Sequence, residues 1–130
     1  MPDKKDFISI FKAETEDHLT KLDKGLVDLE KHPENLELVK ELNRKVHTIK
    51  GSSRIFGFYE IQEIAHRIED IFEKASQKKI AFNSQLAQKI FKGLDAIKAI
   101  LEMVSKEERV SVDVSEICKT FGINALHIKL

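Results

Sequence analysis

Residues 35–56 read NLELVKELNRKVHTIKGSSRIF, and this stretch decides the fold class. Its apolar positions recur at alternating steps of three and four residues, which is the spacing of one buried face of an α-helix. These positions are Val39, Leu42, Val46, Ile49 and Phe56, with Ser53 at the missing step. The stretch therefore predicts an amphipathic helix that packs against neighbouring helices.

Three further stretches repeat this periodicity on either side. The first ends at His32-Pro33, because proline disfavours the helical conformation in the residue before it. The next spans about residues 59–76, and the last follows Asn83, a plausible N-cap. Their apolar stripes are Phe7, Phe11, Leu19, Leu22, Leu26 and Leu29; Ile61, Ile64, Ile68, Ile71 and Ala75; and Leu86, Ile90, Leu94, Ile97, Leu101 and Val104. Since the connections are short, we predict an all-α, antiparallel up-down-up-down four-helix bundle over about residues 4–105.

The remaining residues, about 106–130, carry a weaker pattern. Val110, Val112 and Val114 alternate as in a strand, whereas residues 115–121 could form a short helix that stops at Gly122. We favour a short additional C-terminal helix. Residues 1–130 would then be a single domain made of the bundle and this extension.

Length, charge and cysteine content narrow the class of protein. The 130 residues suit one domain, and 22 basic residues balance 22 acidic ones, without the basic excess that is usual in nucleic-acid-binding proteins. No apolar run approaches the ~20 residues of a membrane span, and the charged N-terminus does not resemble a signal peptide. A single cysteine fits a reducing compartment. We therefore expect a cytoplasmic protein that binds neither nucleic acid nor membrane.

His47 is the candidate for chemistry in the second helix. It follows the core residue Val46, so it should lie at the edge of the stripe and face solvent. Lys50 and Gly51, three and four residues on, share its helix surface. Lys50 could supply positive charge for a phosphoryl group. Because glycine inside a helix costs ~1 kcal/mol relative to alanine, Gly51 indicates either a close helix contact or a need for open space beside the imidazole.

His66 and Glu69 form a second pair on the third helix. If that helix packs antiparallel to the second, the pair can approach His47. A carboxylate that accepts a hydrogen bond from Nδ1–H would fix the tautomer and leave the Nε2 lone pair free. Each residue alone has an ordinary structural explanation, but their combination is specific.

The segment His47-Thr48-Ile49-Lys50-Gly51-Ser52-Ser53 resembles the phosphoacceptor motif of histidine phosphotransfer (HPt) domains, His-x-x-Lys-Gly followed by small residues. Residues 56–58 are similar to the turn that follows this motif. Residues 66–70 resemble the next helix in the N-terminal phosphotransfer (P1) domain of CheA-type chemotaxis histidine kinases. Many CheA-type members have glycine where this chain has Ser52, which blurs the subfamily but leaves the phosphoacceptor unaffected.

The resemblance implies a function and a site. His47 would accept a phosphoryl group from a kinase catalytic domain and donate it to an aspartate of a response-regulator receiver domain. Glu69 would hydrogen-bond the imidazole, while Lys50 and His66 would complete the network.

The resemblance also implies a chain that is a substrate and carrier without autonomous kinase activity. In agreement, the sequence has no Gly-x-x-x-x-Gly-Lys-Ser/Thr phosphate loop. We expect no cofactor and no metal in this chain. ATP and Mg²⁺ would be bound by the kinase partner, and Mg²⁺ also by the receiver.

Other functions stay open at this point. Within the HPt class, the chain could be the first domain of a CheA-type kinase or a stand-alone phosphorelay protein. A metal-binding bundle would use two Glu-x-x-His motifs, and Glu63 to His66 is the single match. A non-catalytic interaction bundle would be marked by loss of the acceptor histidine, which is present here.

Overall fold

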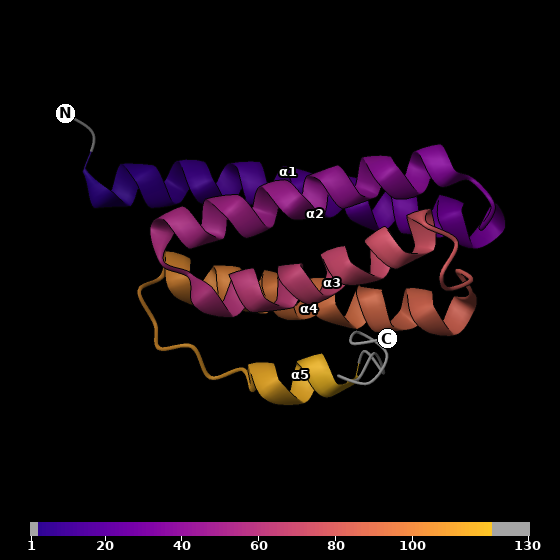
Figure 1. Ribbon diagram of the computed structural model, residues 1–130. Coiled ribbons are helices and arrows are strands. Elements are labelled where there is room, and N and C mark those ends of the chain that lie inside the picture. Colours follow the sequence, from indigo (N-terminus) through magenta and orange to yellow (C-terminus); the bar gives the residue numbers. More distant parts are fainter. Residues whose placement is uncertain (1–2, 121–130) are drawn as a thin grey trace.

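The computed structural model describes residues 3–120, which contain five α-helices and no strand (Figure 1). The all-α prediction is therefore confirmed. The helices are α1 (Lys4–Lys31), α2 (Leu36–Phe56), α3 (Tyr59–Ser76), α4 (Ser84–Ser105) and α5 (Val114–Thr120).

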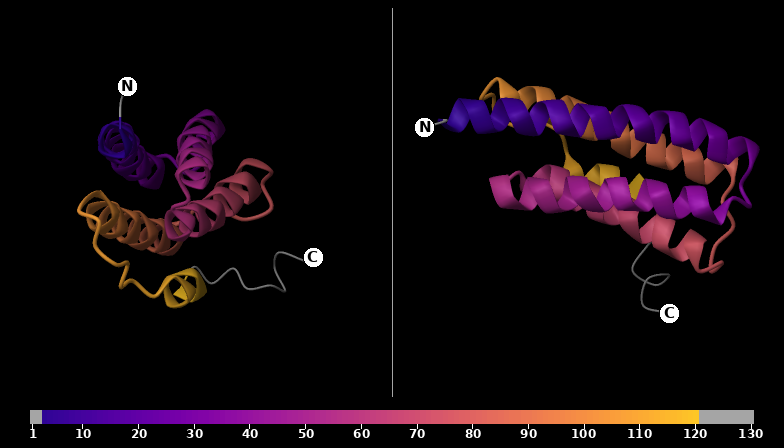
Figure 2. Two further views of the ribbon diagram at one scale, coloured as in Figure 1. Left: turned by 90° about the vertical axis from the view of Figure 1, so that its left-hand side faces the viewer. Right: turned by 90° about the horizontal axis from the view of Figure 1, so that it is seen from above.

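The four long helices form an antiparallel bundle, in which each helix runs opposite to the one before it (Figure 1). Helices α1 and α3 each contact both α2 and α4, so the four surround one core (Figure 2). The short helix α5 lies outside this bundle, against α3 and α4. This arrangement leaves the outer surfaces of α2 and the adjoining side of α3 uncovered by other helices.

Local signals in the sequence set the helix boundaries. The side chains of Asn35 and Asn83 accept hydrogen bonds from the backbone amides of Leu38 and Leu86, at 3.1 and 2.8 Å, and so begin α2 and α4. Gly57 ends α2 in the left-handed region with φ 79°, which glycine adopts without a steric penalty. The turn at Gly57 folds α3 back along α2, and this pairing positions the candidate site.

The predicted stripes form the core, with exceptions at their ends. Phe7 is 47% exposed and Ile8 is buried in its place, and Phe56 is also exposed. The first turns of α1 extend beyond the end of α2 (Figure 1), so a side chain there lacks a neighbour on one side. Leu86 and Val104 are partly buried. Several buried positions lie beside the predicted stripes, among them Ala65, Phe72 and Ile100.

The C-terminal extension contains the short helix that the pattern favoured. Val110 and Val112 pack partly buried against the core without forming a strand. Phe121 and Gly122, the predicted end of this helix, lie outside the described residues. No helix in the described range 3–120 is long and apolar enough to span a membrane.

Candidate functional site

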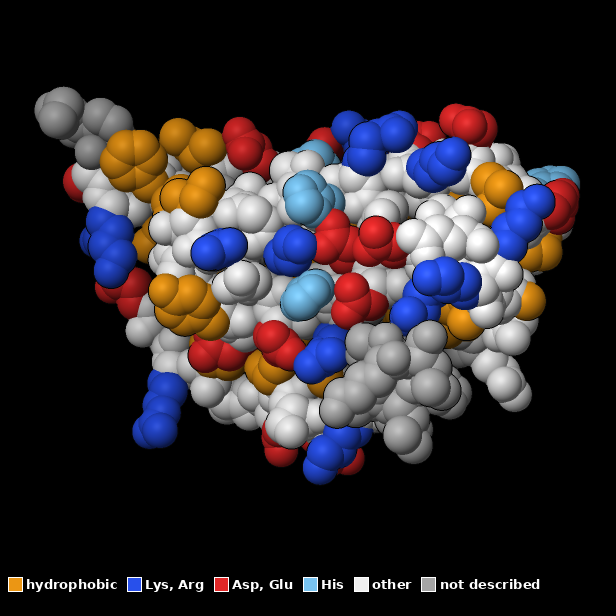
Figure 3. Space-filling model, viewed as in Figure 1, with side chains coloured by type: hydrophobic (Ala, Val, Ile, Leu, Met, Phe, Trp, Pro, Cys, Tyr) orange, Lys and Arg blue, Asp and Glu red, His pale blue; other side chains and the backbone are white. Residues whose placement is uncertain are grey.

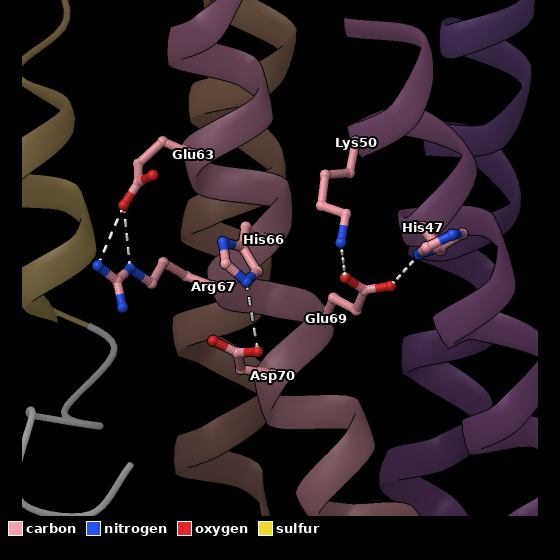
Figure 4. Close-up of polar contacts among 7 residues, drawn as sticks. All are labelled: His47, Lys50, Glu63, His66, Arg67, Glu69 and Asp70. Atoms are coloured by element: carbon pink, nitrogen blue, oxygen red, sulfur yellow. Dashed lines mark hydrogen bonds and ion pairs between the residues drawn. The ribbon is translucent and has the colours of Figure 1, made fainter. Parts of the chain in front are cut away.

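The site lies on the exposed surface where α2 and α3 run side by side. The His47 side chain on α2 is 66% exposed, and its Nδ1 atom hydrogen-bonds Oε2 of Glu69 on α3 (Figure 4). An ionised carboxylate can only accept, so Nδ1 carries the proton in this contact. In the uncharged ring, Nε2 then holds the lone pair and is available as a nucleophile.

Glu69 is a buried carboxylate with a donor on each oxygen. Its side chain is 11% exposed, and its Oε1 atom accepts a hydrogen bond from Nζ of Lys50 at 2.5 Å. Burial raises the pKa of Glu69, but the hydrogen bonds from Lys50 and His47 outweigh burial and bring this pKa below its ordinary value. Glu69 is therefore ionised at neutral pH and fixed as an acceptor.

Lys50 has a partner that the sequence pattern did not assign to it. Its side chain is 25% exposed and extends toward Glu69, between α2 and α3 (Figure 4). The ammonium charge thus compensates the Glu69 carboxylate. The antiparallel register could have indicated this contact, because helix positions three apart are neighbours and the pairing of residues 47 and 69 brings residue 50 close as well.

His66 does not join this network in the described structure. Its Nε2 atom lies 3.8 Å from Oδ1 of Asp70, and its side chain is half exposed. Figure 4 shows His66 and Asp70 together on the opposite side of Glu69 from His47. No hydrogen bond within residues 3–120 connects His66 to His47, Lys50 or Glu69. Of the four predicted site residues, the structure brings together His47, Glu69 and Lys50.

Gly51 lies beside open space. A Cβ atom added at Gly51 would meet no atom within 4 Å, whereas one added at Gly25 would lie 2.3 Å from Leu42 Cδ2. A side chain at position 25 would therefore force the buried Leu42 side chain to shift, whereas one at position 51 would displace no neighbour. Of the two explanations for Gly51, a close helix contact or open space beside the imidazole, this contrast favours open space. On the same face of the molecule, histidine, basic and acidic side chains gather over α2 and α3 (Figure 3).

Replacing Gly51 with alanine distinguishes the effect of this residue on fold stability from its effect on the approach of a partner to His47. We expect Gly51→Ala to stabilise the fold by about 0.5–1 kcal/mol, because the new Cβ meets open space and alanine favours the helix. If the space serves an approaching partner, the phosphorylation of His47 that the resemblance to HPt domains implies should become slower in the same variant. Thermal unfolding and a phosphorylation time course measure the two effects.

Gly25→Ala is the matched comparison for this prediction. It makes the same helix-favouring change at a site where Leu42 must move, so it should not gain stability. An unchanged phosphorylation rate in a more stable Gly51→Ala protein would contradict the idea that a partner uses the open space.

The described residues contain no group of three or more histidine, cysteine, aspartate or glutamate side chains that could hold a metal ion. Glu63, the glutamate of the single Glu-x-x-His match, pairs instead with Arg67, with 3.1 Å between Oε1 and Nη2 (Figure 4).

A family model, a curated protein and two solved structures all relate this chain to histidine phosphotransfer domains. The model of the Hpt domain family matches residues 6–107. The chemotaxis protein CheA of Halobacterium salinarum is 34% identical over 110 residues, which is 85% of this chain and 16% of that protein. The chain thus spans about a sixth of the length of this relative.

Two solved structures are similar in fold. The CheA phosphotransferase domain from Thermotoga maritima has a TM-score of 0.77 and 34% identity, and the match covers 79% of this chain and 98% of that chain. A solution structure of the histidine phosphotransfer domain of CheA has a TM-score of 0.83 and 31% identity, and covers 93% of this chain and 92% of that chain.

Proposed function

The chain belongs to the Hpt domain family, and from this premise we propose that His47 carries a phosphoryl group in two-component signalling. A histidine kinase catalytic domain donates the group, and an aspartate in a response-regulator receiver domain accepts it. The observation that carries this proposal is the hydrogen bond from the exposed His47 ring to the buried Glu69 carboxylate.

The contact with Glu69 prepares Nε2 for attack. Imidazole is largely uncharged near neutral pH, and the carboxylate holds the proton on Nδ1. The Nε2 lone pair attacks the γ-phosphorus of ATP, so that a P–N bond forms while the P–O bond to ADP breaks. The ring gains positive charge in this step, and the adjacent Glu69 carboxylate stabilises it. Positioning and charge stabilisation of this kind dominate phosphoryl transfer.

The partners supply everything else that the reaction needs. We place ATP and its Mg²⁺ in the kinase domain and a second Mg²⁺ in the receiver, so that this chain holds no cofactor of its own. Of the two HPt settings, we favour the P1 domain of a CheA-type kinase in the cytoplasm over a stand-alone carrier. The likeness to CheA proteins and to CheA phosphotransfer structures supports this choice.

A labelling experiment tests the proposed function. The chain is incubated with γ-labelled ATP and a CheA-type kinase catalytic domain, and then with a receiver domain and Mg²⁺. We expect label on His47 that is lost in acid and persists in base, followed by its transfer to the receiver. Absence of label, or an acid-stable label on a serine, would exclude the carrier role.

A further inference from the structure

Because Lys50 is paired with Glu69, the phosphoryl group on His47 needs another cationic partner. This inference rests on the proposed function. A phosphoryl group on Nε2 is an exposed dianion, and cationic side chains stabilise such groups through charge-assisted hydrogen bonds. Lys50 is held by the Glu69 carboxylate at 2.5 Å and is three-quarters buried. The cation that meets the phosphoryl group should therefore be another residue.

The orientation of the His47 ring determines where a phosphoryl group on Nε2 would lie. Nδ1 points toward Glu69 on α3, so Nε2, on the other side of the ring, faces away from that contact. Side chains on a helix also lean toward its N-terminus, which places the ring over the turn that precedes His47. Residues of the turn just before His47 are therefore the part of α2 that lies nearest to Nε2.

Arg44 occupies that preceding turn. It lies three residues before His47, a spacing that brings Cβ atoms on one helix to about 5–6 Å. Arg44 is exposed and forms no ion pair with any residue in the described range. Arg54 and Lys40 are likewise exposed cations of α2, but seven residues from His47 correspond to about 10 Å along the helix. Among the cations of α2, Arg44 is therefore the one nearest to His47 that has no ion-pair partner in the described residues.

We propose that Arg44 binds the phosphoryl group on Nε2 of His47, while Lys50 remains paired with the Glu69 carboxylate. The guanidinium presents parallel N–H donors that match the oxygens of a phosphoryl group. In hydrolysis of the P–N bond, water attacks the phosphorus and the imidazole leaves. Protonation of the phosphoryl oxygens promotes this reaction. By favouring the dianion, Arg44 lengthens the lifetime of the carrier state.

The experiment uses the isolated chain, loaded chemically with phosphoramidate so that no kinase is needed. The ³¹P resonance of phosphorylated His47 is identified by its absence in His47→Gln. Arg44→Gln should shift this resonance and shorten the lifetime of the phosphohistidine about threefold, as expected for an exposed ion pair. Arg44→Lys should recover most of the lifetime, because it restores the charge without the planar fork. Arg54→Gln removes the same charge from α2 farther away and should match the parent.

Each result decides between the alternatives. Equal resonances and lifetimes in Arg44→Gln and the parent would overturn the assignment of Arg44. Equal effects of Arg44→Gln and Arg54→Gln would also overturn it, because they would show a general field in place of a contact. The parent chain could resist labelling by a kinase and still show the expected Arg44 effect after chemical loading. That result would refute the carrier function and leave the assignment of Arg44 intact.

Discussion

Replacement of His47 by glutamine is expected to abolish kinase-dependent labelling of this chain and its transfer to a receiver. Glutamine keeps a polar side chain at the exposed position but offers no nitrogen lone pair of comparable nucleophilicity. The helical fold should persist, because the His47 side chain is two-thirds exposed and surface substitutions away from packed sites change stability by about 0.5 kcal/mol or less. Label incorporation and far-ultraviolet circular dichroism measure the two properties.

The matched control for this variant is His66→Gln. His66 is also an exposed histidine of the same face, but it pairs with Asp70 and makes no hydrogen bond to Glu69 in the described structure. We expect this variant to retain its phosphoacceptor and to incorporate label to the same final level. Label in the His47→Gln protein would show that His47 is not the acceptor. Loss of label in His66→Gln alone would place the acceptor on α3 instead of α2.

The bundle was predictable because its signals are local and repeated. Asn35 and Asn83 mark helix starts through their side-chain oxygens, and Gly57 marks an end through its positive φ. The apolar period then selects the buried face of each helix. Phe7 fails this rule, because burial at a helix end depends on where the neighbouring helix stops, and no local pattern encodes that length.

The site was predictable only in part, for a related reason. The pattern could place His47 and Glu69 on facing helices, and the structure joins them by a hydrogen bond. It could not choose which donors Glu69 would gain, since one helical step of about 100° separates an inward side chain from an outward one. Lys50 therefore turns to Glu69, while His66, one turn before Glu69, turns to Asp70. No sequence pattern distinguishes Arg44 from other exposed arginines, because its role depends on the pairing of Lys50 with Glu69 in the folded structure.

Replacement of Glu69 by glutamine should slow phosphorylation of His47 by about tenfold to a hundredfold, since hydrogen bonds to charged groups contribute about 1.5–3 kcal/mol. An ionised carboxylate can only accept a hydrogen bond from Nδ1, whereas the amide of glutamine can also donate one to it. A donating amide would favour the tautomer with the proton on Nε2 and so occupy the attacking lone pair. The variant also loses the negative charge that stabilises the developing positive ring. Initial rates at saturating ATP and kinase measure the effect.

Glu63→Gln is the matched control for Glu69→Gln. Glu63 lies on the same helix and pairs with Arg67, so its replacement removes a carboxylate and an ion pair of α3 without touching His47 (Figure 4). Equal rates for the parent and Glu69→Gln would show that Nε2 is reactive without an orienting carboxylate. Equal slowing by both variants would trace the loss to the net charge of the surface. Slowing by Glu69→Gln alone, with the tautomer reversed in the ¹⁵N spectrum of His47, ties the rate to the proton on Nδ1.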